Sequence, residues 1–444
     1  MFSAVARIFR TPDLRRKIAF TIGIVALFRI GSFIPAPFVD FDNVTACVNG
    51  QAGASGLYTL VNLFSGGALL KLSIFALGIM PYITASIIVQ LLRVVIPRFD
   101  TLYKEGQAGQ AKLTQYTRYL TIALGILQST TLITVARSGA LFSGSGNTSA
   151  ECSSIITADG STWYGILLMV ITMTAGTGLI MWMGELITER GIGNGMSLLI
   201  FTSIAAQFPS ALISIFQERG IETLILVILI GILIVAAVIF VEQSQRRIPV
   251  QYAKRMVGRR TYGGNNTYIP IKVNMAGVVP VIFASSLLYL PALIAQFNAP
   301  PAGKAAQPWV QWITDYLTRG DHPLYMALYF LLIVGFTYFY VAITFNPEEV
   351  ADNMKKYGGF IPGIRAGRPT AEYLDYVLTR VTLPGSLYLG LIALIPLIAL
   401  VAINANQNFP FGGTSILIMV GVGLETVKQI DSQLQQRHYE GLLR

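Results

Sequence analysis

The sequence predicts an all-α polytopic membrane protein with ten transmembrane helices, and two observations carry this prediction. Hydrophobic residues make up 53% of the 444 residues and charged residues only 12%, with a mean hydropathy of +0.60, values outside the range of an ordinary soluble domain. The apolar residues also lie in long stretches that carry almost no charge. Because every backbone polar group must be paired inside the bilayer, a crossing helix needs about 20 mostly apolar residues.

In chain order, the predicted helices cover residues 18–37, 72–96, 115–136, 163–187, 193–216, 222–241, 272–295, 322–345, 374–401 and 411–430. An even number of crossings puts both termini on the same side of the membrane. Five basic residues precede the first helix: Arg7, Arg10, Arg15, Arg16 and Lys17. Since basic connections close to helix ends stay in the cytoplasm, we predict that both termini are cytoplasmic.

The distribution of all 32 Lys and Arg residues agrees with this orientation. Four of them lie in the outer segments: Arg137, Arg219, Lys304 and Arg319. Arg29 and Lys71 lie in apolar stretches, which leaves 26 on the cytoplasmic side. The first apolar stretch contains Arg29 and precedes nine more helices, so we expect a retained helix and not a cleaved signal peptide. Arg29 should face the helix bundle or extend outward to the interface.

Between the first two helices, residues 57–70 are apolar but too short to cross a bilayer, and the stretch is interrupted at Phe64–Ala68. This pattern predicts a re-entrant half-helix. Such backbone at membrane depth is tolerated only when it is buried in protein or lines a cavity, which indicates a vestibule on the outer side. The alternative is an interfacial helix that lies on the outer surface.

The only two cysteines, Cys47 and Cys152, fall in predicted outer loops. An oxidising compartment would permit a disulfide between them. Two unpaired thiols are the alternative, because the sequence does not give the Cα separation that a disulfide requires.

Signatures of catalysis are absent from the sequence. It contains no Cys-x-x-Cys, His-Glu-x-x-His or Walker-type motif, and its only histidines are His322 and His438. We therefore expect no catalytic residue, no metal site, no cofactor and no enzymatic activity. Gly191–Gly195 follows a membrane helix and not a strand, which favours a flexible helix start over a phosphate-binding loop. Glu185 lies near the inner end of its helix, where a role at the membrane boundary is expected.

Two inner connections, residues 242–271 and 346–373, are long for simple turns, and connections of this length are usually functional. The first carries Arg246, Arg247, Lys254, Arg255, Arg259 and Arg260, and the second carries Lys355, Lys356, Arg365 and Arg368. Positive charge on two projecting loops suits docking to an acidic partner, either RNA phosphate or an acidic protein surface.

Several motifs resemble the SecY/Sec61-alpha family, whose members are the pore-forming subunits of protein-conducting channels. The motifs are Leu63–Leu69, Ser73–Ser86, Gln115–Tyr119, Ile187–Gly195, Val273–Gly277 and Phe360–Arg365. Their order and number make the resemblance specific, and it extends through nearly the whole chain.

The resemblance implies two inverted halves, residues 18–216 and 217–430, between a cytoplasmic N-terminus (1–17) and a cytoplasmic tail (431–444). It also implies an hourglass pore with an aliphatic ring at its waist. The matching residues are Ile79, Ile83, Met196, Ile200, Ile282 and Ile418. The first four form two i,i+4 pairs, which lie on one helical face. A narrow apolar ring excludes ions by dewetting.

In the family, residues 57–70 would be the plug that closes the outer funnel. Its central residues are Leu63, Phe64, Ser65, Gly66, Gly67 and Ala68. The second and seventh helices would form a lateral gate, with Gln128 and Asn274 as its polar residues. Docking of the motor or the ribosome would involve Arg255, Arg259, Arg260 and Arg365.

The function implied by the resemblance is a passive conduit in the cell membrane that translocates unfolded secretory polypeptides and releases apolar segments into the lipid. The implied partners are the small membrane subunits SecE and SecG, the SecA motor ATPase, ribosomal RNA of the ribosome, signal sequences, nascent polypeptides and membrane lipids. The alternative is a secondary transporter of small solutes, which ten helices would also fit. A transporter should carry polar or charged contacts near the midplane, and the predicted waist is aliphatic.

Overall fold

The computed structural model describes residues 11–41, 43–44, 66–69, 71–137, 155–252, 255–257, 260–262, 267–297, 307–318, 322–403 and 413–440. The helices of the first half are α2 (Pro12–Gly31), α5 (Met80–Val95), α6 (Pro97–Lys104), α7 (Gln107–Arg137) and α8 (Trp163–Arg190). The helix α9 (Gly195–Gln243) joins the halves. The second half contains α10 (Val279–Phe297), α11 (Pro308–Ile313), α12 (Pro323–Thr344), α13 (Pro347–Lys356), α14 (Arg368–Ile403) and α15 (Gly413–Glu440). The strands are β1 (Gln245–Tyr252), β2 (Arg255–Val257), β3 (Arg260–Tyr262), β4 (Thr267–Lys272) and β5 (Gly359–Phe360).

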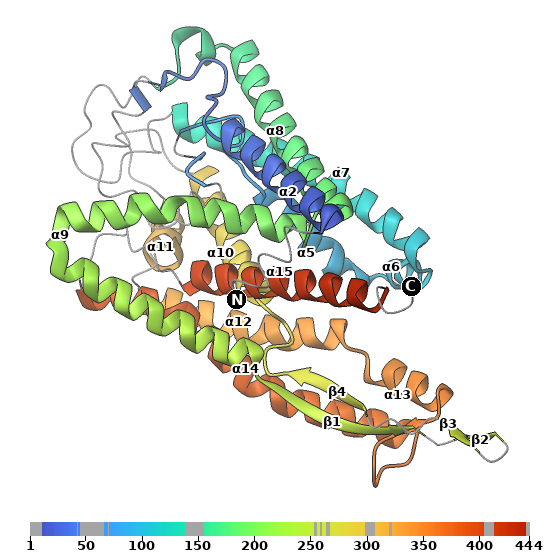
Figure 1. Cartoon of the computed structure of the whole chain (residues 1–444). Coiled ribbons are helices and arrows are strands. Elements are labelled where there is room, and N and C mark those ends of the chain that lie inside the picture. Colours follow the sequence, from blue (N-terminus) through green and yellow to red (C-terminus); the bar gives the residue numbers. More distant parts are fainter. Residues whose placement is uncertain are drawn as a thin grey trace.

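The two halves lie side by side, with α2, α7 and α8 in the upper part of Figure 1 and α12 and α14 in the lower part. The helix α9 turns back between them at Gly220, whose φ of 79° and ψ of −179° are not helical. A positive φ is accessible to glycine without steric cost. The structure therefore keeps the two predicted helices 193–216 and 222–241 and places their break at this residue.

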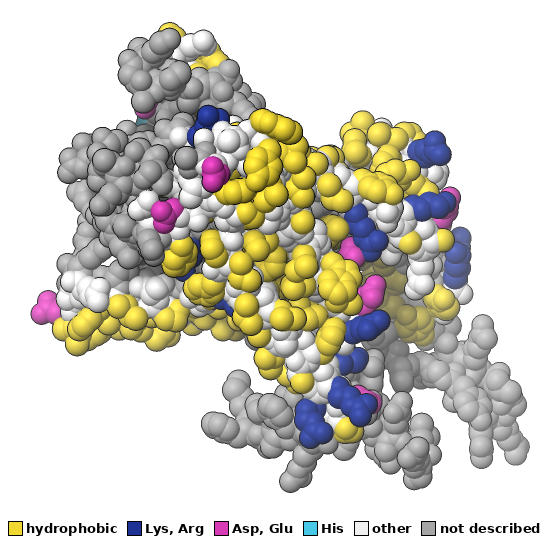
Figure 2. All heavy atoms as spheres, turned by 90° about the horizontal axis from the view of Figure 1, so that it is seen from above, with side chains coloured by type: hydrophobic (Ala, Val, Ile, Leu, Met, Phe, Trp, Pro, Cys, Tyr) yellow, Lys and Arg dark blue, Asp and Glu magenta, His cyan; other side chains and the backbone are white. Residues whose placement is uncertain are grey.

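Six of the described helices are long and apolar enough to cross a membrane, and a seventh is added if α5 and α6, which meet at a bend of 99°, form one span. Large apolar side chains, among them Ile22, Ile232 and Leu331, are exposed on the outside of the bundle. Figure 2 shows hydrophobic side chains over the middle of one face, with most of its Lys and Arg side chains toward the right and lower edges. This distribution fits a surface in contact with lipid.

The second predicted helix, residues 72–96, starts later than expected. Residues 72–79 form turns, with φ of 45° at Leu72 and 55° at Gly78, and the helix begins at Met80. Leu72, Ala76 and Leu77 are buried in a cluster with α7 and α8 residues. The apolar character of this stretch therefore reflects burial in protein and not contact with lipid.

Backbone hydrogen bonds connect the non-helical segments that follow α2 and precede α5 and α8. Ala36 N donates to Leu72 O over 3.0 Å, and Ile74 N donates to Ile34 O over 3.0 Å. Asp40 N in turn donates to Ile155 O over 3.0 Å. The chain after α2 thus pairs with both the segment before α5 and the segment before α8, which satisfies polar backbone groups that no helix satisfies.

Other helix ends also differ from the predicted ones. The helix α2 ends at Gly31, where the chain enters a turn before Pro35, which pairs with Ser73. The helix α10 starts at Val279 and not at residue 272, since β4 extends to Lys272 and the segment between them is not helical. At the other end of the chain, α15 continues ten residues beyond the predicted boundary.

The turn between α8 and α9 positions the first residues of α9. Gly195 N donates to Thr188 Oγ1 over 2.9 Å, and the Asn194 side chain accepts hydrogen bonds from the N–H groups of Met196 and Ser197. Such capping satisfies free N–H groups at a helix start. Sequence reasoning favoured a flexible helix start here, whereas the structure shows a turn held by side-chain hydrogen bonds.

We expect Gly195→Ala to destabilise the protein by about 1–3 kcal/mol, the usual range for overpacking. A Cβ at this position would lie 1.9 Å from Gly184 O, so the backbone of α8 or α9 would have to move. The melting temperature of the purified protein in detergent measures the effect. The matched control is Gly178→Ala on α8, where a Cβ meets nothing within 4 Å. Equal melting temperatures for the two variants would contradict the tight packing of this turn.

Candidate functional site

The six residues of the predicted ring lie in one apolar cluster at the contact between the two halves. Ile79, Ile200, Ile282 and Ile418 are buried members of this cluster, with at most 9% of each residue exposed. Ile83 and Met196 are partly buried and pack against it. Below, "waist cluster" means this group of residues and its neighbours in the same core. The central side chains of the cluster are almost fully covered by their neighbours.

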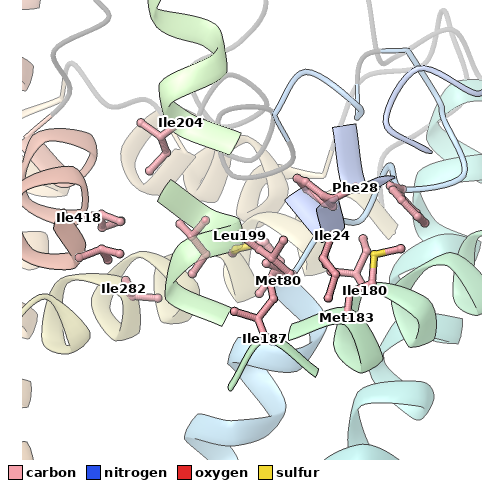
Figure 3. Packing of buried hydrophobic residues seen from close by; sticks show 14 residues of the cluster. Ile24, Phe28, Met80, Ile180, Met183, Ile187, Leu199, Ile204, Ile282 and Ile418 are labelled. Carbon is pink, nitrogen blue, oxygen red and sulfur yellow. The ribbon is translucent and has the colours of Figure 1, made fainter. Parts of the chain in front are cut away.

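Four helices bring these side chains together. Ile79 caps the start of α5 and Ile83 lies one turn later, with Ile83 N donating to Ile79 O over 3.1 Å. Met196 and Ile200 lie on the first two turns of α9, Ile282 lies on α10, and Ile418 lies on α15. Figure 3 shows Ile282 and Ile418 on one side of the cluster, with Leu199 between them and the residues of the first half.

The structure adds residues that the sequence did not single out. They are Ile24, Phe28, Phe75, Met80, Ile180, Met183, Ile187, Leu199, Ile204 and Val422. Phe28 and Phe75 stack at a ring-centroid distance of 5.9 Å, which ties α2 to the segment before α5. Nothing in the composition of a membrane helix distinguishes such residues from lipid-facing ones, so only the packing could identify them.

The described end of the predicted plug, Gly66–Leu69, lies next to α9. A Cβ on Gly66 would lie 3.3 Å from Ser203 Cα, and a Cβ on Gly67 would lie 4.0 Å from Gln207 Nε2. Ser203 and Ile200 are one turn apart on α9, so this end is near the waist cluster. Ala68 is fully buried. The other predicted plug residues, Leu63, Phe64 and Ser65, lie outside the described residues.

The two predicted gate residues are both buried but have different surroundings. Gln128 is on α7, whereas Asn274 precedes α10 and donates from Nδ2 to the Glu242 carboxylate and to Gly277 O, the latter over 3.1 Å. No hydrogen bond in the described part of the chain joins Gln128 to Asn274. The helix α10 contacts both α5 and α7.

The two basic loops share one β-sheet. Strand β1 pairs with β4 within the first loop, and its residues Gln251 and Tyr252 pair with Phe360 and Gly359 of β5 in the second loop. A core lies beneath this sheet, formed by buried side chains from β1, β4, α12, α13, α14 and the segments that follow β4 and β5: Ile248, Val250, Ile271, Ala276, Val341, Met354, Ile361, Leu374, Val377 and Leu378. The two loops therefore fold together as one unit.

The structure describes three of the four predicted docking residues, Arg255, Arg260 and Arg365. Arg255 and Arg260 belong to β2 and β3, where their backbones pair with Tyr262 and Val257. Arg259 lies outside the described residues. Arg365 is exposed on a turn between Gly363 and Gly367, which both have positive φ, and Thr370 Oγ1 donates to its carbonyl over 2.8 Å.

One ion pair that the sequence did not reveal joins two helices of the first half. Arg118 of α7 binds Glu185 of α8 through two hydrogen bonds, Nε to Oε1 over 2.9 Å and Nη2 to Oε2 over 2.6 Å. The forked guanidinium matches the carboxylate geometry. The two residues are 67 positions apart, so no local pattern could have predicted their contact.

The described residues contain no group of three or more His, Cys, Asp or Glu side chains arranged to hold a metal ion. Two other predicted site residues, Cys47 and Cys152, lie outside the described part of the chain.

Comparisons with known proteins place this geometry in a family. The SecY family model matches residues 73–427. Protein translocase subunit SecY of Streptomyces galbus is 65% identical over 450 residues, and that of Streptomyces coelicolor is 65% identical over 448 residues, each covering 100% of both chains.

Solved structures share the fold at low sequence identity. A protein-conducting channel has a TM-score of 0.60 and 18% identity, and covers 93% of this chain and 91% of its own. A SecY protein whose plug domain is described as stabilising the closed state and maintaining a membrane seal has a TM-score of 0.59 and 19% identity, over the same fractions of the two chains. The fold is thus the ten-helix architecture of these channels, and the family model and full-length relatives show that the chain belongs to the SecY family.

Proposed function

We propose that this chain is the pore-forming subunit of a protein-conducting channel, which moves unfolded polypeptides across the membrane and releases apolar segments sideways into lipid. The observation that carries this proposal is the waist cluster, in which residues from α5 and α9 meet Ile282 of α10 and Ile418 of α15. The apolar contact between the halves is where a pore would open. A narrow aliphatic ring dewets and blocks ions, and its flexible side chains can deform around a passing chain.

We expect the double variant Ile83→Gly, Ile282→Gly to raise ion leakage, because loss of both side chains widens and wets the ring. Leakage is measured as halide efflux from vesicles that contain the purified channel complex. The control is Ile122→Gly, Ile232→Gly, which places the same two glycines in α7 and α9 at exposed isoleucines and so carries the same helix-propensity cost.

The pore assignment also has a direct test. A photo-crosslinking residue at Ile83 should react with a secretory chain arrested during translocation, whereas one at Ile122 should not. Reaction at neither position, or equal leakage from the two double variants, would remove the waist cluster from the pathway.

The plug and the lateral gate follow from the same proposal. The described end of residues 57–70 lies against α9 beside the waist, which suits a segment that closes the outer funnel. The contacts of α10 with α5 and α7 form the seam through which a signal sequence would reach lipid, with Gln128 and Asn274 on its two sides. Polar side chains at such a seam would weaken apolar contact between the halves and so ease its opening.

The proposed orientation puts the termini in the cytoplasm of a cell whose plasma membrane contains the channel. The helices α6 and α13 and the strands β1 to β4 lie toward the right of Figure 1, and the turn of α9 at Gly220 lies at its left edge. The sheet and α13 carry the basic loops, which remain on the cytoplasmic side.

The proposed channel is passive, so we assign the energy that drives translocation to its partners. The basic loop tips suit an acidic face of the SecA motor and phosphates of the ribosome, and small membrane subunits similar to SecE and SecG would complete the complex. The solved channel from the canine endoplasmic reticulum is bound to a ribosome and shares this fold with a TM-score of 0.59 and 18% identity. Binding through Arg255, Arg259 and Arg260 should weaken steeply with salt.

Arg365→Glu should greatly reduce SecA-driven translocation while protein level and complex assembly stay near wild type. Arg365 is exposed on a turn, so its loss spares the core, while charge reversal replaces attraction with repulsion at the docking surface. Protease protection of a secretory precursor in SecA-dependent vesicles measures translocation. Lys112→Glu on α7 is a matched control, because it reverses an exposed charge outside both loops. A wild-type rate for Arg365→Glu would exclude this loop as the docking site.

We expect a disulfide between Cys47 and Cys152. Val44 and Ile155 belong to one buried cluster, and each lies three residues along the chain from one of the cysteines. Three residues span at most about 10 Å, so neither cysteine can be farther than that from its neighbour in the cluster. Intact-mass measurement should show a gain of two hydrogens upon reduction, and a Cys47→Ser variant should show none. Identical masses of the wild-type chain before and after reduction would leave two free thiols.

A further inference from the structure

We propose that Arg29 is a positioning residue that holds the plug closed through the backbone carbonyl of Gly66. Arg29 Nη1 donates to Gly66 O over 3.0 Å, across 37 positions of sequence. This hydrogen bond connects the last turn of α2 with the described end of residues 57–70. The inference rests on the proposed channel function and adds a residue that controls its closed state.

The carbonyl of Gly66 is an important partner of the Arg29 guanidinium, because the other described groups around it are a cation and an aromatic ring. Among the ion pairs of the described residues, none includes Arg29. Its guanidinium carbon lies 5.3 Å from the centroid of the Phe33 ring, and Lys71 Nζ lies 4.2 Å from the same centroid. Two cations on one ring repel each other, so neither neutralises the other. The Gly66 carbonyl supplies the negative dipole that a guanidinium in an apolar helix requires.

Gly66, the acceptor residue of this hydrogen bond, has little free space around it. Gly66 has φ of 69°, and a Cβ there would lie 3.0 Å from Arg29 Nη1 and 3.3 Å from Ser203 Cα. A side chain at this position would therefore strain the backbone and press on both neighbours. Gly66 thus lies between α2 and α9, close to the Arg29 guanidinium and to Ser203, which is one helical turn from the waist residue Ile200.

Opening by displacement of the plug has to break this bond and leave the guanidinium without its acceptor. A hydrogen bond from a charged donor is among the stronger ones, so losing the bond to Gly66 O on opening favours the closed state in an empty channel. An extended polypeptide in the pore brings a series of backbone carbonyls, and any of them can replace Gly66 O as acceptor. The contact therefore resists opening when no chain is present and loses its effect when a chain enters.

The test compares Arg29→Gln and Arg29→Lys with wild type in vesicles that contain the intact channel complex. Halide efflux without a translocating chain should rise roughly tenfold for Arg29→Gln, the effect of losing one hydrogen bond to a charged group. Arg29→Lys keeps the charge and should leak less than Arg29→Gln. Lys71→Gln is the matched control, because it removes a cation from the same ring but not the bond to Gly66, and its efflux should match wild type.

Gly66→Ala tests the same contact with Arg29 intact, in case the Arg29 variants assemble poorly. It should leak, and the double variant with Arg29→Gln should leak no more than the stronger single variant, because both changes disrupt one contact. A merely structural role of Arg29 would instead give independent, multiplying effects.

Deletion of residues 57–70 distinguishes a failure of the Arg29–Gly66 contact from a failure of the channel function. If the deletion leaks while Arg29→Gln and Gly66→Ala do not, the contact has no role in closure and the channel function stands. If the deletion does not leak and the wild-type complex moves no polypeptide, the channel function itself fails.

Discussion

The fold depends on one constraint: a backbone N–H or C=O group at membrane depth must find its partner within the protein. Helices satisfy most of these groups, but this chain also contains non-helical segments beside its helices. The structure pairs them individually. Residues 34–40 exchange hydrogen bonds with residues 72–74 and 155–157, and the turn before α9 uses the side chains of Thr188 and Asn194. The carbonyl of Gly66 receives a guanidinium.

This pairing shapes the centre of the molecule. The segment before α5 is tied to the chain after α2, which places Ile79 at the start of α5 beside the first turn of α9. The turn at Gly195 fixes Met196 and Ile200 in the same way. Apolar contact between the halves then needs only Ile282 and Ile418 to complete the waist cluster. Such contact is non-directional, which suits a seam that must open and close without breaking specific bonds.

At the two basic loops the opposite principle applies, because directional bonds join them. Pairing of β1 with both β4 and β5 makes one sheet above a shared core. A force applied at the tip of one loop is transmitted to the other and to α12 and α14 beneath them. The two loops therefore form one unit with the second half of the chain.

The sequence by itself determined the class of protein, the approximate positions of the helices and the family, because hydropathy and motif order are local properties that survive without coordinates. It also identified Ile79, Ile83, Met196, Ile200, Ile282 and Ile418 through the resemblance, and the structure placed all six in or against one cluster.

Sequence reasoning was wrong where apolar residues are buried in protein and not in lipid. Residues 72–79 are as apolar as a membrane helix, but their backbone bonds go to the chain after α2. Hydropathy cannot distinguish these two environments.

Only the tertiary structure decided which distant residues meet. The pairing of Arg118 with Glu185, the shared sheet of the two loops and the bond from Arg29 to Gly66 each join parts of the chain that are far apart in sequence. A charged residue in an apolar stretch indicates that a polar partner exists, because burial of a charge without a partner is costly. Which residue is the partner depends on how the helices pack.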